Sequence, residues 1–310
     1  MSKLLHLTAG PHIHSHHSTR GVMLDVIISL IPAAIAGIIL FGERAIAVIA
    51  ISILSCVLCE LLFNIAIKKE QTVGDLSAVV TGLLLALNLP VDVPFWQIIV
   101  GAIFAIVIVK CCFGGIGKNI VNPAIASRVF MLIAFSDMAK ASFPVDATAG
   151  ATPLGALASG EAVPSTLDLF LGKCGGAIGE TCTLALIIGG IYLVSRRVIM
   201  WHLPVAFIGT TYLFTLCLVG FDFAAALNWT LAGGLFIGAI FMATDYVTSP
   251  ATWNGQVIFG FLCGIITVMI RFFGNYPEGV SFAILLMNIL TPYIDIWTAR
   301  KIFGADGGKA

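Results

Sequence analysis

The sequence predicts an all-α polytopic membrane protein with about ten transmembrane helices, arranged as two inverted repeats of five helices each. Three observations predict this class. Only 10% of the 310 residues are charged, against about a quarter in an ordinary soluble domain. The mean hydropathy is +1.05, and apolar stretches of nearly membrane-spanning length recur along the chain. Basic and acidic residues number 16 each, so no net charge favours nucleic acid, and the lipid bilayer is the expected partner.

Ten apolar segments are the expected spans. Their approximate bounds are 24–41, 45–67, 75–89, 94–110, 121–135, 177–195, 202–220, 227–243, 255–273 and 279–297. The third and the fifth are short and are interrupted by Gly, Asn or Pro. Irregular backbone at membrane depth is tolerated only where protein or a polar cavity satisfies the freed groups. We therefore expect these two segments to line a functional space.

The distribution of positive charge predicts the orientation. An even number of spans puts both termini on one side, and that side carries 11 Lys and Arg residues against 4 on the other, with Arg128 left inside the fifth segment. The positive-inside rule then places both termini in the cytoplasm. The expected organisation is a cytoplasmic N-terminal segment, a first five-helix half, an external loop, a second five-helix half and a cytoplasmic tail, with the bounds 1–23, 24–135, 136–176, 177–297 and 298–310.

An internal similarity predicts the two repeats. Residues 82–94 ("GLLLALNLPVDVP") and 238–250 ("GAIFMATDYVTSP") both run from Gly to Pro over the same spacing, and an apolar span follows each. Because each half holds an odd number of spans, the halves must have opposite orientations. Inverted repeats usually place a binding site near the midplane, at broken helices in corresponding positions. The loops at 87–94 and 243–250 fit that description.

The external loop contains the most unusual polar stretch, "VDATAGATPL" (145–154). Its small residues allow a bulky partner to approach the backbone. A threonine hydroxyl is a poor nucleophile unless something activates it, so any chemistry here is expected to be done to the threonine by another enzyme. The alternative is an ordinary turn, in which Pro153 enforces extended backbone at Thr152.

Charged residues in or beside apolar segments are the other candidates. Arg128 lies where a charge is costly and usually faces the bundle interior, paired or bound to a ligand. The alternative is a side chain that reaches the cytoplasmic interface. Glu60 has the same functional interpretation, with a purely structural partner as the alternative. Asp245 belongs to the broken loop and is a candidate ligand, whereas Asp25 suits a helix N-terminus.

Three further patterns have weaker implications. "FGGIGKN" (113–119) could cradle a phosphate through its backbone N–H groups and Lys118, or could be a flexible turn. The tract "HIHSHH" (12–17) could bind a metal, but a solvated tail that docks against partners is favoured. Most of the eight cysteines lie in or beside apolar runs, and Cys56 and Cys59 are interpreted as packing residues.

Four stretches of the sequence resemble the RnfD/NqrB family of respiratory membrane subunits, in the family's order. Residues 145–154 resemble its flavinylation motif, Asp-x-x-(Ser/Thr)-Gly-Ala-Thr, with Ala149 in place of the Ser or Thr. Residues 10–33 are similar to the family's N-terminal signature. Residues 113–124 are similar to its Gly-rich turn and Asn-Pro-Ala helix start, and residues 243–250 to its Thr-Asp-x-x-Thr-(Ser/Thr)-Pro segment.

The resemblance implies that FMN is esterified through its phosphate to Thr152 by a separate flavin transferase. In the wider family it also implies a second, non-covalent flavin such as riboflavin. With the intramembrane and turn charges added, the candidate cofactor-binding residues are Thr152, Asp146, Gly150, Ala151, Arg128, Lys118 and Asp245.

The family's Rnf complex couples electron flow between ferredoxin and NAD to movement of Na⁺ or H⁺ across the bacterial cytoplasmic (inner) membrane. The resemblance therefore implies an electron-relay subunit, not a complete enzyme by itself, with the other Rnf subunits (A, B, C, E and G) as partners. The main alternative is a stand-alone secondary transporter, since inverted repeats, broken helices and intramembrane charges are also its hallmarks. A purely structural scaffold subunit is the third possibility. Neither alternative needs the motif at 146–152.

Overall fold

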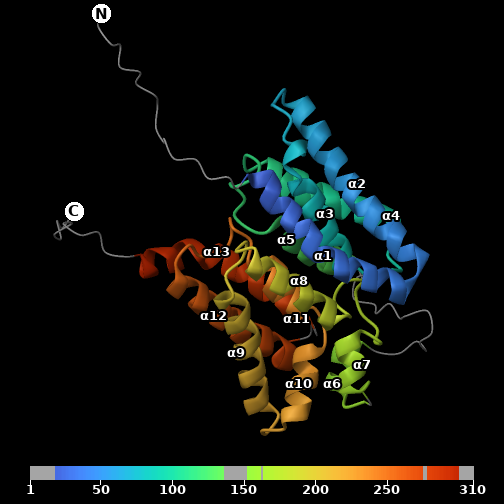
Figure 1. Cartoon of the computed structure of the whole chain (residues 1–310), viewed down its shortest axis with the longest axis vertical. Coiled ribbons are helices and arrows are strands. Elements are labelled where there is room, and N and C mark those ends of the chain that lie inside the picture. Colours follow the sequence, from blue (N-terminus) through green and yellow to red (C-terminus); the bar gives the residue numbers. More distant parts are fainter. Residues whose placement is uncertain (1–17, 136–151, 162, 275–277, 300–310) are drawn as a thin grey trace, which may run out of the picture.

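The computed structural model describes residues 18–135, 152–161, 163–274 and 278–299. The regular elements of these residues are all helices, as Figure 1 shows. Those before residue 136 are α1 (Thr19–Phe41), α2 (Glu43–Ala66), η1 (Val73–Asp75), α3 (Ser77–Leu87), α4 (Phe95–Ile103), η2 (Phe104–Cys111) and α5 (Pro123–Ala134). Those after residue 151 are α6 (Pro153–Ser159), α7 (Thr166–Leu171), α8 (Thr183–Ser195), α9 (His202–Leu218), α10 (Phe223–Leu231), α11 (Leu235–Ile237), η4 (Gly238–Met242), α12 (Trp253–Phe273) and α13 (Val280–Thr298).

Side-chain caps fix where several of these helices begin. The Ser18 hydroxyl accepts from the N–H of Gly21 at the start of α1, and the Thr252 hydroxyl accepts from Gly255 at the start of α12. At α5 the Asn122 side chain accepts from the N–H groups of two residues of the first turn, and Pro123 is the first helical residue. Ser, Thr and Asn at these positions satisfy N–H groups that have no partner within the helix.

The helices confirm an all-α membrane protein that crosses the bilayer more than once. By length and composition α1, α2, α12 and α13 are able to span it, and α10 with α11–η4 would be a further span although the pair is bent by 66°. Every predicted segment coincides with a helix or a run of helices. Several of these have 10 to 17 residues, however, whereas a straight crossing needs about 20. The ten-span count and the inverted repeats therefore stay predictions.

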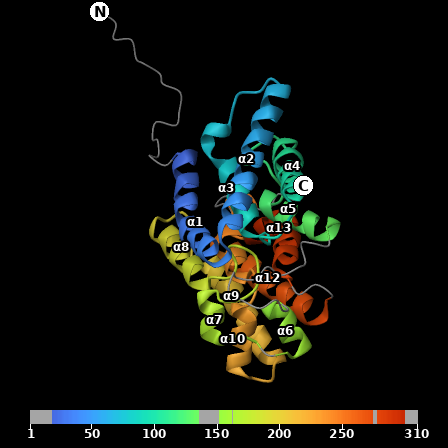
Figure 2. The same ribbon diagram turned by 90° about the vertical axis from the view of Figure 1, so that its right-hand side faces the viewer.

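The helices before and after the 136–151 gap form two neighbouring groups, and both views place α1–α5 above α9, α10 and α12 (Figures 1 and 2). Contacts between α1 and α8 and between α5 and α13 join the groups. The approach of α1 to α8 is close, since a Cβ added at Gly189 would lie 2.1 Å from the carbonyl oxygen of Ser29. Large apolar side chains such as Ile39, Leu62 and Ile191 are exposed on the outside of the bundle, as expected for a lipid-facing surface.

The region expected as an external loop differs from a loop. Its described residues contain the short helices α6 and α7, which begin after the capping residues Thr152 and Ser165 and end at Gly160 and Gly172. Both glycines have positive φ, a conformation that glycine adopts without strain. Residues 136–151, with the first part of the unusual stretch, lie outside the described residues.

The start of the span predicted at 177 is wrong by six residues, because α8 begins at Thr183. The preceding backbone bonds to the end of α3 instead. The N–H of Ile178 donates to the carbonyl of Leu89 at 3.1 Å, and the N–H of Gly179 donates to that of Leu87 at 2.8 Å. The carbonyls at the end of a helix have no partner within the helix. A segment from the second half thus satisfies the broken end of α3.

Candidate functional site

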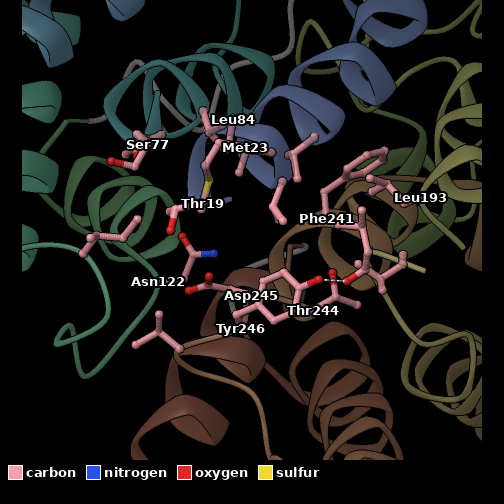
Figure 3. A pocket seen from close by; sticks show the side chains of 18 of the residues that line it. Thr19, Met23, Ser77, Leu84, Asn122, Leu193, Phe241, Thr244, Asp245 and Tyr246 are labelled. Atoms are coloured by element: carbon pink, nitrogen blue, oxygen red, sulfur yellow. Dashed lines mark hydrogen bonds between the residues drawn. The ribbon is translucent and has the colours of Figure 1, made fainter. Parts of the chain in front are cut away.

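A cavity of about 860 Å³ lies between the two groups of helices. Figure 3 shows residues that line it, from α1, α3, the turn before α5, the end of α8 and the segment after η4. Its polar lining residues include Ser77, Thr81, Asn119, Asn122, Thr244, Asp245, Lys110, Arg196 and Arg197. Its apolar lining residues include Met23, Leu84, Leu193 and Phe241. A mainly apolar space of this volume with a few polar groups is typical of sites for small molecules and cofactors.

Asp245 lies in the segment that follows η4. Its carboxylate accepts from the hydroxyl of Thr248 at 3.1 Å. Burial raises the pKa of Asp245, while the hydrogen bonds from Thr248 and neighbouring groups lower it in part. Next in the chain, the hydroxyl of Tyr246 donates to the carbonyl of Val198, which ties this segment to the α8–α9 connection. The predicted loop at 243–250 thus forms one wall of the cavity, and Asp245 lines it.

Two asparagines hold the segments on which the cavity depends. The side-chain amide of Asn122 donates to the carbonyl of Met242 at 3.2 Å, and the amide of Asn88 donates to the Met242 sulfur at 3.5 Å. Asn88 follows the last turn of α3, Asn122 precedes α5, and Met242 ends η4. The loops predicted to correspond in the two halves therefore meet in space at Asn88 and Met242.

Arg128 is buried in the protein interior, with 4% of its surface exposed. Its guanidinium donates to the backbone carbonyl and to the side-chain oxygen of Asn88, both at 2.6 Å. It also forms an ion pair with Glu278, and it lies 3.6 Å from a carboxylate oxygen of Glu180. Of the two interpretations from the sequence, the paired interior charge is confirmed. These partners are protein groups, and Arg128 is not among the residues that line the cavity.

A second buried arginine holds the break between α10 and α11. Arg271 donates to the carbonyls of Trp229 at 2.6 Å and Ala232 at 3.2 Å. Glu180 lies beside the same break, since a Cβ added at Gly234 would be 3.0 Å from its carboxylate oxygen. The sequence analysis singled out neither Glu180, Glu278 nor Arg271. A charged residue at the end of an apolar segment was the available signal, but it is common in solvated positions.

Glu60 is paired inside the first half. Its carboxylate lies 2.9 Å from the ammonium of Lys110, and the two side chains are only 2% and 4% exposed. The other carboxylate oxygen accepts from the Thr72 hydroxyl at 2.6 Å. The sequence analysis counted Lys110 as a charge at the membrane surface, and that interpretation is wrong. The irregular helix η2 turns Lys110 inward to the wall of the cavity.

Thr152 is half-buried and is the capping residue of α6. Its hydroxyl oxygen accepts from the N–H of Gly155 at 3.0 Å. The backbone is extended at φ −58° and ψ 151°, which confirms the restriction expected from the proline that follows. Leu154 packs against Trp229 and Ala232, so α6 lies against the break that Arg271 holds. Asp146, Gly150 and Ala151 lie outside the described residues.

Lys118 is exposed and does not line the cavity, although Gly117 and Asn119 on either side of it do. Its methylene chain covers Gly114, where an added Cβ would lie 2.7 Å from the Lys118 Cδ. Gly114, Gly115 and Gly117 all have positive φ, so the Gly-rich turn depends on glycine. No phosphate-binding role for Lys118 is tested by this placement.

These features define an all-α membrane protein with a ligand-sized cavity between two helical halves, next to a network of buried charges. The chain belongs to the NQR2, RnfD, RnfE family, whose model matches residues 6–304.

Several curated relatives match nearly the whole chain, and each is the D subunit of its complex. The chain is 47% identical over 308 residues to that of the Na(+)-translocating ferredoxin:NAD(+) oxidoreductase complex of Acetobacterium woodii, covering 97% of this chain and 95% of that protein. It is 39% identical to that of the proton-translocating ferredoxin:NAD(+) oxidoreductase complex of Clostridium ljungdahlii, covering 96% of each chain. It is 31% identical to that of the ion-translocating oxidoreductase complex of Escherichia fergusonii, covering 96% of this chain and 98% of that protein.

Proposed function

We propose that the chain is the D subunit of an ion-translocating ferredoxin:NAD⁺ oxidoreductase complex, in which it relays electrons through bound flavin. The observation that carries the proposal is the similarity of nearly the full chain to subunits with this name, at up to 47% identity. The partners of the chain would be the other Rnf subunits. The chain by itself would not complete the reaction between ferredoxin and NAD⁺.

A covalent FMN on Thr152 is the first part of the proposal. The hydroxyl is partly accessible and belongs to a short helix that packs on the bundle. The Thr152 oxygen acts as an acceptor in its bond with Gly155. Replacing the hydroxyl hydrogen by the phosphorus of a phosphoester therefore leaves that capping bond possible. A flavin transferase would form the ester, and Asp146, Gly150 and Ala151 would complete the motif it recognises. Bound FMN would supply one-electron and two-electron redox chemistry.

A second, non-covalent flavin such as riboflavin would occupy the cavity. The mainly apolar walls suit a flat aromatic ring system, and the polar groups suit its hydrogen-bonding edge and a ribityl chain. Asp245 would accept hydrogen bonds from that ligand. Arg128 would act indirectly, since it holds the end of α3 whose Leu84 lines the cavity. Lys118 would contribute positive charge at the Gly-rich turn beside the cavity.

The orientation belongs to the same proposal. With ten spans in two inverted halves, both termini would be cytoplasmic, in the bacterial inner membrane. The surface with Lys69, Gly117 and Arg197 would then face the cytoplasm, and α6 with Thr152 would face outward. A covalent tether is useful on the outer side, because a freely dissociating flavin would be lost there by dilution.

Flavin analysis of the purified complex tests the proposal. The intact chain should carry the added mass of FMN when a flavin transferase is co-expressed, and acid extraction should release a second flavin that is not covalently bound. A chain with neither flavin in an active complex would contradict the relay and would favour the stand-alone transporter or the scaffold.

A further inference from the structure

A continuous chain of hydrogen bonds connects the protein surface to the cavity through the interior of the first half. Its members are Thr72, just before η1, Glu60 on α2, Lys110 on η2 and Ser77 at the start of α3. Each can both accept and release a proton, if Glu60 and Lys110 change their charge in turn. The proposed flavin sites use none of these four side chains.

The links of the chain are short. The Thr72 hydroxyl donates to one carboxylate oxygen of Glu60 at 2.6 Å. The Lys110 ammonium donates to the other at 2.9 Å and to the Ser77 hydroxyl at 2.6 Å. Thr72 is exposed, whereas Glu60, Lys110 and Ser77 are no more than 6% exposed. Lys110 and Ser77 line the cavity, so the chain has one end at the surface and the other at the cavity.

The surroundings isolate the inner part of this chain. Cys56, Ala78, Ala102, Ile106 and Cys111 form an apolar cluster from the helices that hold Glu60 and Lys110. A buried ion pair in such a place is weak evidence for stability, because well-packed apolar residues of similar volume are often as stable or more so. Its hydroxyl partners on both sides therefore suggest a role beyond packing.

Other titratable groups also face the pair. The Cys56 and Cys111 thiols interact electrostatically with both Glu60 and Lys110. Asp75 accepts a hydrogen bond from Ser77, and the Lys69 ammonium acts on the same region through Cys111. The outer end of the chain thus carries both an acid and a base.

We propose that Thr72, Glu60, Lys110 and Ser77 form a proton-uptake relay from the surface to the flavin assigned to the cavity. This inference depends on the proposed function, because the cavity ligand is the proton acceptor. The relay would supply the proton that accompanies each electron delivered to that ligand from a reduced one-electron donor such as ferredoxin, which the relatives' names include.

One cycle moves one proton and leaves the relay unchanged. The Lys110 ammonium releases a proton through the Ser77 hydroxyl to the acceptor in the cavity. Thr72 then passes a proton from surface water to the Glu60 carboxylate. Glu60, now a carboxylic acid, gives that proton to the Lys110 amine. The net change is one proton from water to the cavity, with Lys110 again an ammonium and Glu60 again a carboxylate.

The experiment measures proton uptake by the purified complex after rapid photoreduction of its flavin, with a pH-indicator dye as the probe. Flavin content is measured on the same samples. The double variant Glu60→Gln with Lys110→Met removes both charges together and so leaves no lone buried charge. Thr72→Val breaks only the exposed end. Thr81→Val is the matched control, since Thr81 lines the cavity from the same helix but donates to its own backbone, at the carbonyl of Ser77.

Proton uptake should slow by roughly tenfold to a hundredfold in the double variant and in Thr72→Val, with unchanged flavin content, while Thr81→Val keeps the wild-type rate. A small membrane-permeable weak acid should restore the rate, which a merely structural defect would not allow. Wild-type rates in both relay variants with flavin bound would overturn the relay alone. A wild-type complex that retains no second flavin would overturn the cavity assignment, and the relay would then have no acceptor.

Discussion

Arg128 on α5 donates to both the backbone carbonyl and the side-chain oxygen of Asn88, the residue at which α3 ends. A guanidinium presents several donors in a fixed fork, so one side chain satisfies the broken helix end and fixes the asparagine. The amide nitrogen of the same asparagine points to Met242. A charge that is costly in a membrane protein thereby orders the junction between the two halves, beneath the cavity.

Replacing Arg128 by Gln should destabilise the protein by about 3–5 kcal/mol, because it leaves buried carboxylate charge without its partner. Thermal unfolding of the detergent-purified protein measures the effect. Arg44→Gln is the control, since exposed Arg44 also donates to a loop backbone, at the carbonyl of Val91, and should cost about 1 kcal/mol. Equal losses of stability in the two variants would contradict the role assigned to Arg128.

The contact of α1 with α8 should not tolerate a methyl group at Gly189, where an added Cβ would meet the Ser29 carbonyl at 2.1 Å. Gly189→Ala is expected to cost about 1–3 kcal/mol through overpacking, measured by thermal unfolding. At Gly209, also within a helix, an added Cβ has nothing within 4 Å. Gly209→Ala should leave stability unchanged or raise it by up to about 1 kcal/mol, and the reverse order of the two variants would refute the close approach.

Thr152→Ala should abolish covalent flavin, measured as flavin fluorescence of the denatured band and as the mass of the intact chain after co-expression with a flavin transferase. Thr148→Ala should largely keep the flavin, because its hydroxyl is misplaced in the motif. Fluorescence that persists in Thr152→Ala would show that the tether lies elsewhere. A wild-type chain without added FMN mass would point first to Ala149, the residue that departs from the motif.

Asp245→Asn should change the pH dependence of stability. Burial raises the pKa of Asp245 in the folded state, so the carboxyl opposes folding more strongly as pH rises above the usual range for Asp. Asn does not titrate, so the Tm of the variant minus that of the wild type should increase from about pH 4 to about pH 7. Asp222→Asn exchanges one good N-cap for another at an exposed site and should show no such increase. Asp245→Asn should also retain less riboflavin.

The orientation can be measured with reporters. A reporter fused after Ala310 should report the cytoplasm, and a tag inserted at the exposed Ser159 of α6 should be reachable from outside in right-side-out vesicles. A protected tag at Ser159 would reverse the orientation and would place Thr152 on the cytoplasmic side. The N-terminal side of the membrane would then also be misassigned.

The sequence by itself determined the class and the order of the elements. Long apolar runs, Pro and Gly act locally, so the positions of the ten segments and of the breaks near Asn88 and Asp245 agree with the helices of the structure. The interior position of Arg128 follows from the same local reasoning, because its charge has no low-energy place in lipid. The motif ending at Thr152 is likewise a local feature.

Only the tertiary structure decided which distant groups meet. Lys110 and Glu60 are 50 residues apart in sequence, and Arg128 and Glu278 are 150 apart, so no periodicity relates them. The late start of α8 has the same cause, since residues 178 and 179 bond to the end of α3 rather than to their own helix. Partner choice among buried polar groups depends on how the helices pack, because each group must be satisfied by whatever the fold brings beside it.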